Sequence, residues 1–131
     1  TNFTILKNID NIAESLSTPS HIIIKFISIV LGCSFVDNKL AGNYSNDDIQ
    51  KIIYQYITYY ILCSNCTNPE LIPQLSGKKK KLNVQFSCSS CGNISLNTSK
   101  NKIYDKGILL LKKYLQNNEW KITKGNFGVS I

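Results

Sequence analysis

Two stretches of the sequence share the pattern Cys-x-x-Cys: Cys63-Ser64-Asn65-Cys66 and Cys88-Ser89-Ser90-Cys91, with 21 residues between them. Each stretch can form a turn, or knuckle, that directs two thiolates towards one point. Two knuckles together complete a tetrahedral shell of four sulfur ligands. The separation is slightly longer than the usual ~15–20 residues, but the extra residues can loop out. The spacing therefore predicts a zinc ribbon in which Cys63, Cys66, Cys88 and Cys91 bind one Zn²⁺.

A four-cysteine site has a structural role, because it leaves no coordination position open for water or substrate. The alternative is a pair of disulfides in a secreted domain. Three features argue against this alternative: Cys33 is left over, the sequence shows no signal peptide, and the two knuckles have the same spacing. Reduced cysteines at metal-binding spacing indicate the cytosol or nucleus, so we expect a cytoplasmic protein.

Length and composition suit a small folded protein. The chain has 131 residues, of which 43% are hydrophobic, enough for one compact domain or for two small modules with a shared interface. A three-stranded ribbon has almost no core, so the metal must stabilise it; structural zinc contributes on the order of 10–16 kcal/mol at neutral pH. The most apolar segment, 22–31, is interrupted by Lys25 and Ser28, so we expect no membrane span.

Positive charge is concentrated in the second part of the chain. Residues 1–77 hold four lysines and six acidic residues, a net charge of −2, whereas residues 78–131 hold eleven lysines and two acidic residues, a net charge of +9. This asymmetry suggests that the second part faces a polyanion, although a solvated lysine surface is the simpler alternative. All 15 basic residues are lysine, which excludes bidentate guanidinium contacts.

Hydrophobic periodicity predicts an α+β module over residues 1–62, with helices packed on a small sheet. Its expected elements are a strand at 1–6, helices at 9–16 and 20–31, a hairpin at 35–40 around Asp37-Asn38, and a helix at 45–60.

Local signals set the helix boundaries. Asn8 or Asp10 can cap the first helix, Gly32 supplies a left-handed residue after the second, and Ser45 opens the third, with Asp48 as an acidic variant of the capping box. The residues expected to face the core are Ile23, Phe26, Ile27 and Val30 in the second helix, and Ile49, Ile52, Ile53, Tyr56 and Tyr60 in the third.

The zinc ribbon is expected over residues 63–98, and a C-terminal helix with a tail over 99–131. The ribbon strands are predicted at 71–75, at 82–86, where hydrophobic residues alternate, and from Ile94 to Leu96. The helix is predicted at 104–116, with Tyr104, Ile108, Leu111 and Leu115 at helical spacing. Trp120 either docks on the fold or anchors a partner, and docking is favoured.

We find no catalytic constellation. His21, the single histidine, lies at the start of an apolar helix with no nucleophile near it in sequence, so a cap or core role is expected. Cys33 is interpreted as a small buried hydrophobe. Asp47 and Asp48 suit the positive end of a helix, and the sequence has no glycine-rich phosphate loop. An enzyme is therefore not expected.

Lysines are the best candidates for contacting nucleic acid. A turn at Lys78–Lys81 would project four ammonium groups that reach phosphates without burial, which would position the protein without reading bases. The RNA-binding candidates are Lys39, Lys78, Lys79, Lys80, Lys81, Lys106, Lys112 and Lys113. The tyrosines at 54, 56, 59 and 60 could stack on bases, but they cover more than one helix face, so some must belong to the core.

Three segments resemble one known family. The helix-to-glycine segment 19–32, the first knuckle with its Asn68-Pro69-Glu70 tail, and the second knuckle with Gly92 are similar to a domain shared by eukaryotic initiation factor 5 and the beta subunit of eukaryotic initiation factor 2. The order of elements also agrees, and the resemblance covers residues 3–115. The Asn-Pro-Glu and Cys-Gly details favour factor 5, and the polylysine boxes that precede the domain in the beta subunit are absent.

The resemblance implies a role in translation initiation, with small-subunit ribosomal RNA, initiator tRNA and the initiation factor 2 complex as partners. In factor 5, stimulation of the GTPase relies on an arginine upstream of this domain; that segment and a glycine-rich RNA-contacting loop are not in this sequence. Of the basic residues in the family's hairpin, only Lys39 remains. Thr1 would permit removal of an initiator methionine, which is compatible with an intact chain. A fragment of a longer protein is the equal alternative.

Two functions of different classes are therefore expected. The first is a factor-5-like protein that binds the small ribosomal subunit, without GTPase activation. The second is a beta-subunit-like component, or an adaptor or regulator, that holds the GTPase subunit of initiation factor 2. A zinc-ribbon transcription factor is a third, weaker interpretation, because the helical module precedes the ribbon.

Overall fold

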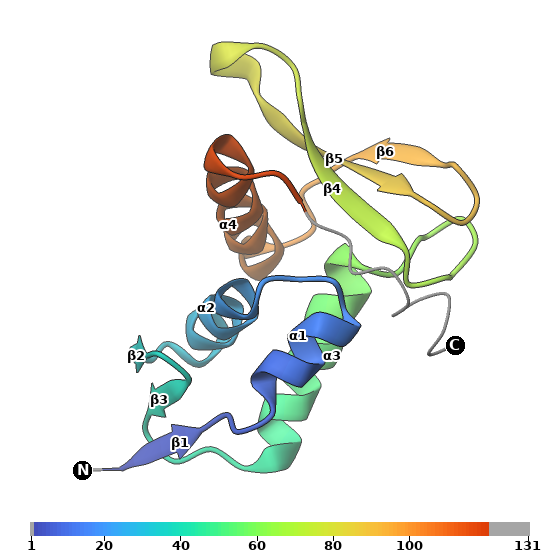
Figure 1. Ribbon diagram of the computed structural model, residues 1–131. Helices are drawn as coiled ribbons and strands as arrows, with labels where there is room; N and C mark the ends of the chain where they lie inside the picture. The colour runs from blue at the N-terminus through green and yellow to red at the C-terminus, as the bar shows by residue number, and fades with distance from the viewer. Residues whose placement is uncertain (1, 121–131) are drawn as a thin grey trace. The chain divides into compact units, whose positions relative to one another are not determined.

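The computed structural model describes residues 2–120, with the side chain of Lys79 excepted, and these residues form four α-helices, one short 3₁₀ helix and two small sheets (Figure 1). The chain forms two compact units, which divide between Tyr56 and Ile57. The elements are β1 (Phe3–Ile5), α1 (Ile9–Ser15), α2 (Ser20–Leu31), β2 (Phe35–Val36), β3 (Lys39–Ala41), α3 (Asn46–Tyr60), β4 (Leu71–Ser76), η1 (Lys79–Lys81), β5 (Asn83–Cys88), β6 (Ile94–Leu96) and α4 (Lys102–Asn117). Within the described part, no helix has the length and apolar character that a membrane crossing requires. The predicted α+β class is confirmed.

The first unit contains a three-stranded antiparallel sheet in the order β1-β3-β2. The predicted Asp37-Asn38 hairpin joins β2 to β3. Leu6, which follows β1, forms two hydrogen bonds with this hairpin: its amide donates to Asn38 O (2.8 Å), and Asn38 Nδ2 donates to Leu6 O (3.2 Å). Leu40 lies fully buried on the inner face of β3. Ile5, Lys39 and Val36 are exposed in paired positions on the other face.

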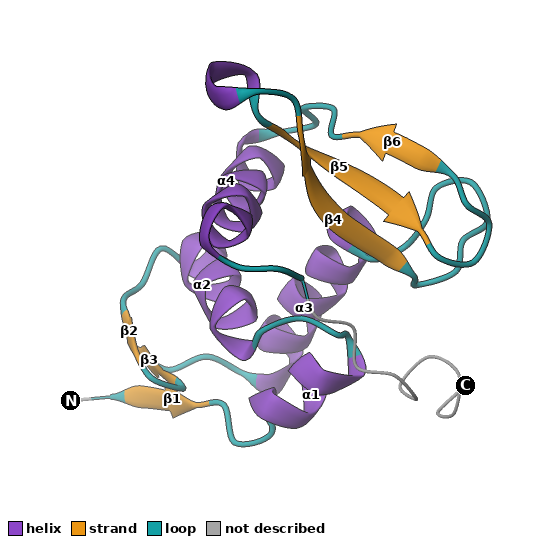
Figure 2. Cartoon of the chain, turned by 45° about the horizontal axis from the view of Figure 1, so that its top comes forward, coloured by secondary structure: helices purple, strands orange, loops and turns teal. Residues whose placement is uncertain are grey.

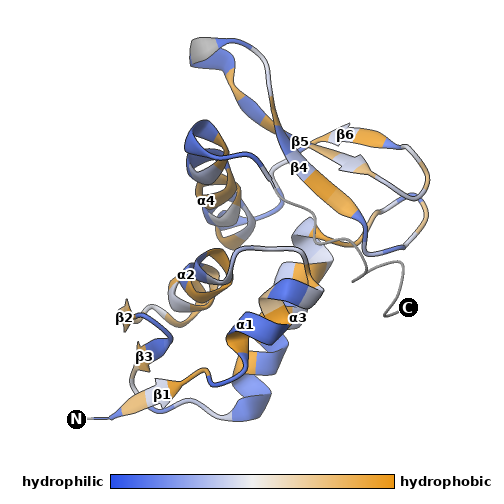
Figure 3. Cartoon of the chain, in the orientation of Figure 1, coloured by the Kyte–Doolittle hydropathy of each residue, from blue (hydrophilic) through white to orange (hydrophobic). Residues whose placement is uncertain are grey.

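The helices of the first unit largely follow the sequence signals. Much of α2 is hydrophobic (Figure 3), and it ends at Gly32, which adopts φ 68°. Ile22 and Ile24 are buried in addition to the predicted residues, whereas Val30 is only half-buried. Phe26 of α2 packs edge-on against Tyr56 of α3, with ring centroids 5.4 Å apart.

The predicted caps of these helices have mixed outcomes. Ser45 Oγ accepts the Asp48 amide (3.1 Å), which confirms the cap of α3. Asn8 occupies the N-cap position of α1 but makes no side-chain capping bond, because its backbone is not extended there (φ −109°, ψ 21°) as a capping residue's normally is.

The second unit contains the ribbon, an antiparallel sheet in the order β4-β5-β6 (Figure 2). Along β5 the side chains alternate between half-buried and buried, as the period-two pattern predicts, and Val84, Phe86 and Cys88 form the buried row. Ile94 and Leu96 in β6 are exposed. The run Lys79–Lys81 forms a short 3₁₀ helix after Gly77, whose φ of 98° explains a glycine at this turn.

Helix α4 packs against β4 and β5 of the ribbon and against the last turn of α3. It begins two residues before the predicted start because Asn101 Oδ1 accepts the Tyr104 amide (2.8 Å). The buried Tyr60 hydroxyl donates to Tyr104 O (2.8 Å), and the Tyr60 ring stacks on the Tyr104 ring at 5.3 Å. Trp120 packs edge-on against Tyr114 at 5.7 Å, so the favoured docking of Trp120 on the fold is observed.

Candidate metal centre and basic surface

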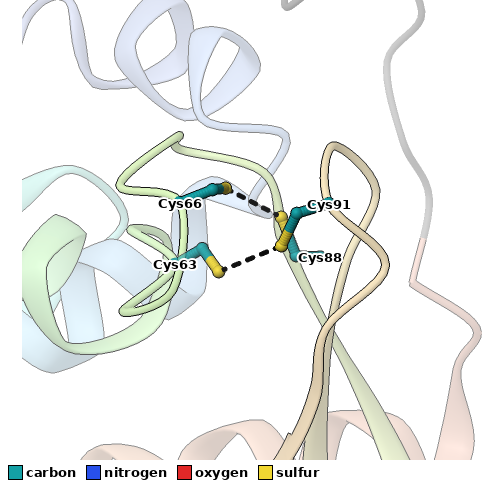
Figure 4. A group of neighbouring side chains, drawn as sticks. All are labelled: Cys63, Cys66, Cys88 and Cys91. Carbon is teal, nitrogen blue, oxygen red and sulfur yellow. Dashed lines mark hydrogen bonds between the residues drawn. The ribbon is translucent and has the colours of Figure 1, made fainter.

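The four knuckle cysteines converge, with their sulfur atoms directed towards one another (Figure 4). All four sulfurs lie within 4.8 Å of one another. Across the gap between the knuckles, Cys63 Sγ lies 3.7 Å from Cys91 Sγ, and Cys66 Sγ lies 3.6 Å from Cys88 Sγ. In each knuckle the first cysteine, Cys63 or Cys88, is buried. The second is more accessible: Cys66 is half-buried and Cys91 is exposed.

Backbone hydrogen bonds shape both knuckles in the same way. The Thr67 amide donates to Cys63 O (2.8 Å), and the Gly92 amide donates to Cys88 O (2.9 Å). Each turn closes on a residue with positive φ, 63° at Thr67 and 77° at Gly92. This conformation favours glycine, which accounts for the Cys-Gly sequence of the second knuckle; Thr67 adopts it at an energetic cost.

Asn65 contacts the sulfurs of both knuckles. Its backbone amide donates to Cys63 Sγ (3.4 Å), and its side-chain Nδ2 donates across the gap to Cys91 Sγ (3.5 Å). Such outer contacts fix ligand orientation and tune metal affinity. The sequence offers no signal for this role, because Asn65 occupies one of the two variable positions of its knuckle.

A second set of polar contacts joins the segments that flank the knuckles. Asn68 Nδ2 donates to Ser90 Oγ (2.7 Å), and Ser89 Oγ donates to Glu70 Oε1 (3.1 Å). The Ser89 amide also donates to Glu70 O (3.1 Å). The Asn-Pro-Glu tail therefore connects the first knuckle to the second, a role that the sequence pattern alone does not reveal.

The environment affects the thiols unequally. At Cys66 the Asn68 backbone amide lowers the thiol pKa, but burial and the three neighbouring sulfurs outweigh that bond and raise the pKa to about 11. At Cys91 the Asn65 side chain and then the Asn93 backbone amide donate hydrogen bonds that lower the pKa to about 6. A bound zinc ion would hold all four as thiolates whatever these values are.

The donor set fits zinc. Tetrahedral Zn²⁺ with Zn–S bonds of about 2.3 Å separates its sulfurs by about 3.8 Å, close to the 3.6 and 3.7 Å found across the knuckles. Soft sulfur ligands select Zn²⁺ over hard ions such as Mg²⁺ or Ca²⁺. When bound, the ion would supply cross-linking of the two knuckles.

The candidate RNA-binding lysines fall in both units. Lys39 is exposed on β3 in the first unit. In the second unit, the exposed candidates are Lys78, Lys80, Lys81, Lys106 and Lys113, and Lys112 is half-buried. The side chain of Lys79 lies outside the described residues.

The remaining candidates take structural positions. Of the tyrosine cluster in α3, Tyr56 and Tyr60 are buried, Tyr59 is half-buried and Tyr54 is 59% exposed, so some are core residues, as predicted. A cap or core role was expected for His21, and the core alternative is wrong because the side chain is exposed in the first turn of α2. Partial desolvation of the ring, followed by the charge of Lys25, lowers its pKa. Cys33 is half-buried, less than expected.

Comparison with known proteins identifies similar sequences. A family model for a domain found in initiation factors 2B and 5 matches residues 1–94. The chain is 31% identical over 93 residues to translation initiation factor 2 subunit beta of Archaeoglobus fulgidus, a match that covers 68% of this chain and 65% of that protein.

Two eukaryotic proteins match at a similar level. Identity is 29% over 104 residues to eukaryotic translation initiation factor 5 of Dictyostelium discoideum, covering 76% of this chain and 25% of that protein. It is 28% over 95 residues to the probable eukaryotic translation initiation factor 5 of Schizosaccharomyces pombe, covering 68% and 24%. The chain thus spans about two thirds of the archaeal subunit and about a quarter of the factor 5 proteins.

Proposed function

The chain belongs to the family of translation initiation factors that includes factor 5 and the beta subunit of factor 2, and from this premise we propose that it is a binding module of translation initiation. It docks on the small ribosomal subunit, near the initiator tRNA and the initiation factor 2 complex, in the cytoplasm. The family match over residues 1–94 is the observation that carries this proposal.

Zinc stabilises the module that carries the basic residues. Cys63, Cys66, Cys88 and Cys91 hold one Zn²⁺ in a structural site, which is supported by the mutual distances of their sulfurs. The ribbon strands β4, β5 and β6 bury one row of side chains, so the cross-link between the knuckles replaces a larger hydrophobic core.

Phosphate contacts lead the binding. Residues 78–131 carry a net charge of +9, and Lys78, Lys80, Lys81, Lys106 and Lys113 present exposed ammonium groups. Lysine contacts phosphate as a point charge, so these residues position the module on RNA without reading its sequence. The 131 residues contain no arginine, so an effect on a GTPase would not come from an arginine of this stretch.

The test is binding to purified small ribosomal subunits over a range of salt concentrations. Affinity should fall steeply with salt, because binding releases counterions from RNA; a flat response would contradict the mechanism. Lys80→Glu with Lys81→Glu should weaken binding and lower the salt slope by about one for each lost phosphate contact. The matched control is Lys7→Glu with Lys51→Glu, which makes the same charge change at exposed lysines of the first unit.

A second candidate function is an adaptor that holds the GTPase subunit of initiation factor 2. It is favoured by the match to the archaeal beta subunit, which extends over 65% of that protein. Pull-down experiments with purified GTPase subunit and with small subunits separate the two functions. If the chain captures the GTPase subunit but not the small subunit, the adaptor function is supported and the ribosomal function is contradicted.

A further inference from the structure

The second unit contains a cavity that neither the metal centre nor the lysine candidates use. It has a volume of about 450 Å³, within the range of small-ligand sites. It lies between the end of α3, the first knuckle, the inner side of the ribbon and the start of α4. Of the four knuckle cysteines, only Cys63 lines it, so it is distinct from the metal centre.

The walls combine aromatic surface with small polar groups. Tyr59, Phe86 and Tyr104 supply aromatic rings, and Asn93 and Thr98 supply amide and hydroxyl groups. Among the described residues that line the cavity, none is acidic. The surroundings therefore suit a planar group with hydrogen-bonding edges better than they suit a cation.

The aromatic wall is held in place before any ligand arrives. The Tyr59 ring packs edge-on against Tyr60 and Tyr104, with centroids 5.6 and 5.4 Å away. Its hydroxyl oxygen accepts a hydrogen bond from Asn101 Nδ2 (2.9 Å). Because the wall is already ordered, the loss of side-chain entropy on ligand binding is smaller.

Lys100 is the one charged residue among those that line the cavity. Its Nζ lies 5.1 Å from the centroid of the Tyr104 ring, within the range of a cation–π contact, so the ammonium group stays beside the aromatic wall. The nearby Asp105 carboxylate accepts a hydrogen bond from Ser99 Oγ (2.8 Å). An anionic group of a ligand can therefore meet Lys100 next to the site where a planar group would lie.

We propose that this cavity binds one unpaired nucleotide of an RNA strand, with its base against the Tyr59 and Phe86 wall and its phosphate on Lys100. The proposal rests on the proposed function, because it names a site through which the module grips RNA. Unpaired bases are commonly recognised by aromatic side chains and by hydrogen bonds to their edges. A buried side chain of a protein partner would use the aromatic wall but would leave the Lys100 charge without a partner.

Ser95 gives a way to fill the cavity without a change of charge. It pairs with Phe86 in the ribbon, so both side chains lie on the same face, and both line the cavity. Its neighbour Ile94 points to the opposite face and is 62% exposed. Ser95→Phe and Ile94→Phe are therefore matched variants that place the same ring on the two sides of β6.

The experiment measures binding of fluorescent single-stranded hexauridylate RNA to the zinc-loaded chain. Ser95→Phe should weaken binding by about fivefold or more, and Lys100→Gln by about threefold or more. Ile94→Phe should stay within about twofold of the unmodified chain, and so should Lys51→Gln, which changes an exposed lysine of the first unit that is not among the RNA-binding candidates. Zinc content and circular dichroism show whether each variant folds. If Ser95→Phe does not fold, Lys100→Gln still tests the proposal.

Three outcomes would overturn the proposal. The first is equal binding by the cavity variants and their controls while salt-dependent binding to small subunits persists; the proposed function then stands without this site. The second is a Ser95→Phe variant that keeps RNA affinity but loses the factor 2 GTPase subunit, which would make the occupant a protein side chain. The third is tighter binding of free uridine monophosphate than of hexauridylate, which would reassign the cavity to a free nucleotide.

Discussion

Gly107 lies in the middle of α4, where glycine lowers helix stability by about 1 kcal/mol relative to alanine. The reason for a glycine here is Tyr60. A Cβ atom at position 107 would lie 2.5 Å from Tyr60 Cζ and closer still to the hydroxyl oxygen. Real Cβ atoms essentially never approach other atoms within 3.0 Å, so Gly107→Ala forces either the Tyr60 ring or α4 to move.

The net effect follows from opposing contributions. Overpacking of a buried contact costs about 1–3 kcal/mol, and displacement of Tyr60 loses its hydrogen bond to Tyr104 O, worth about 1 kcal/mol. Alanine regains about 1 kcal/mol of helix propensity. We therefore expect Gly107→Ala to lower the free energy of unfolding by about 1–3 kcal/mol. A control at exposed Lys106, Lys106→Ala, should change it by less than about 0.5 kcal/mol.

Urea unfolding followed by tryptophan fluorescence measures this change. Trp120 is the single tryptophan, and it packs against Tyr114 in α4, so its emission reports on the second unit. Tyr60→Leu removes all three atoms that the new Cβ would meet, so Gly107→Ala should become neutral or stabilising in that background. If Gly107→Ala is stabilising in the otherwise unmodified chain, or if its effect is the same with Leu at position 60, the steric explanation is wrong.

Other perturbations test separate parts of the structure. Asn65→Ala removes the bond to Cys91 Sγ and should speed zinc loss to a chelator by about tenfold or more; an unchanged rate would show that the amide does not hold the ligand. Gly77→Ala should destabilise the lysine turn by about 1–3 kcal/mol, because φ is 98° and a Cβ would collide with Lys81 O; amide exchange of Lys81 measures it, and exchange as slow as before would contradict the clash. Partial desolvation and the charge of Lys25 lower the pKa of the exposed His21 ring, so the unfolded chain binds this proton more readily and stability should fall as pH decreases below about 6.5. His21→Gln should reduce this fall, and an identical pH profile would show that the histidine does not cause it.

Features that depend on local chemistry were predictable from the sequence. The end of α2 follows from Gly32, because glycine adopts the left-handed conformation that ends a helix at little cost in free energy. The start of α3 follows from Ser45, whose hydroxyl caps the helix. The convergence of the four cysteines follows from the repeated knuckle, since two identical turns can direct their thiols to one point.

Features that depend on distant residues were not predictable. His21 occupies an apolar stretch, yet it is exposed because the orientation of α2 places Ile22 and Ile24 inside. A glycine in a helix gives no information about its partner, and Tyr60 lies 47 residues earlier in the chain. The cavity likewise draws its walls from segments between residues 58 and 104, whose spacing contains no motif.

The ribbon, and with it the basic surface proposed to contact RNA, depends on one metal ion held by four sulfurs. Elemental analysis of the purified chain, combined with X-ray absorption at the zinc edge, tests this claim most directly. We predict one zinc per chain with four sulfur neighbours at about 2.3 Å. A chain that folds without zinc, or a zinc ion with nitrogen or oxygen neighbours in place of one of the sulfurs, would contradict it.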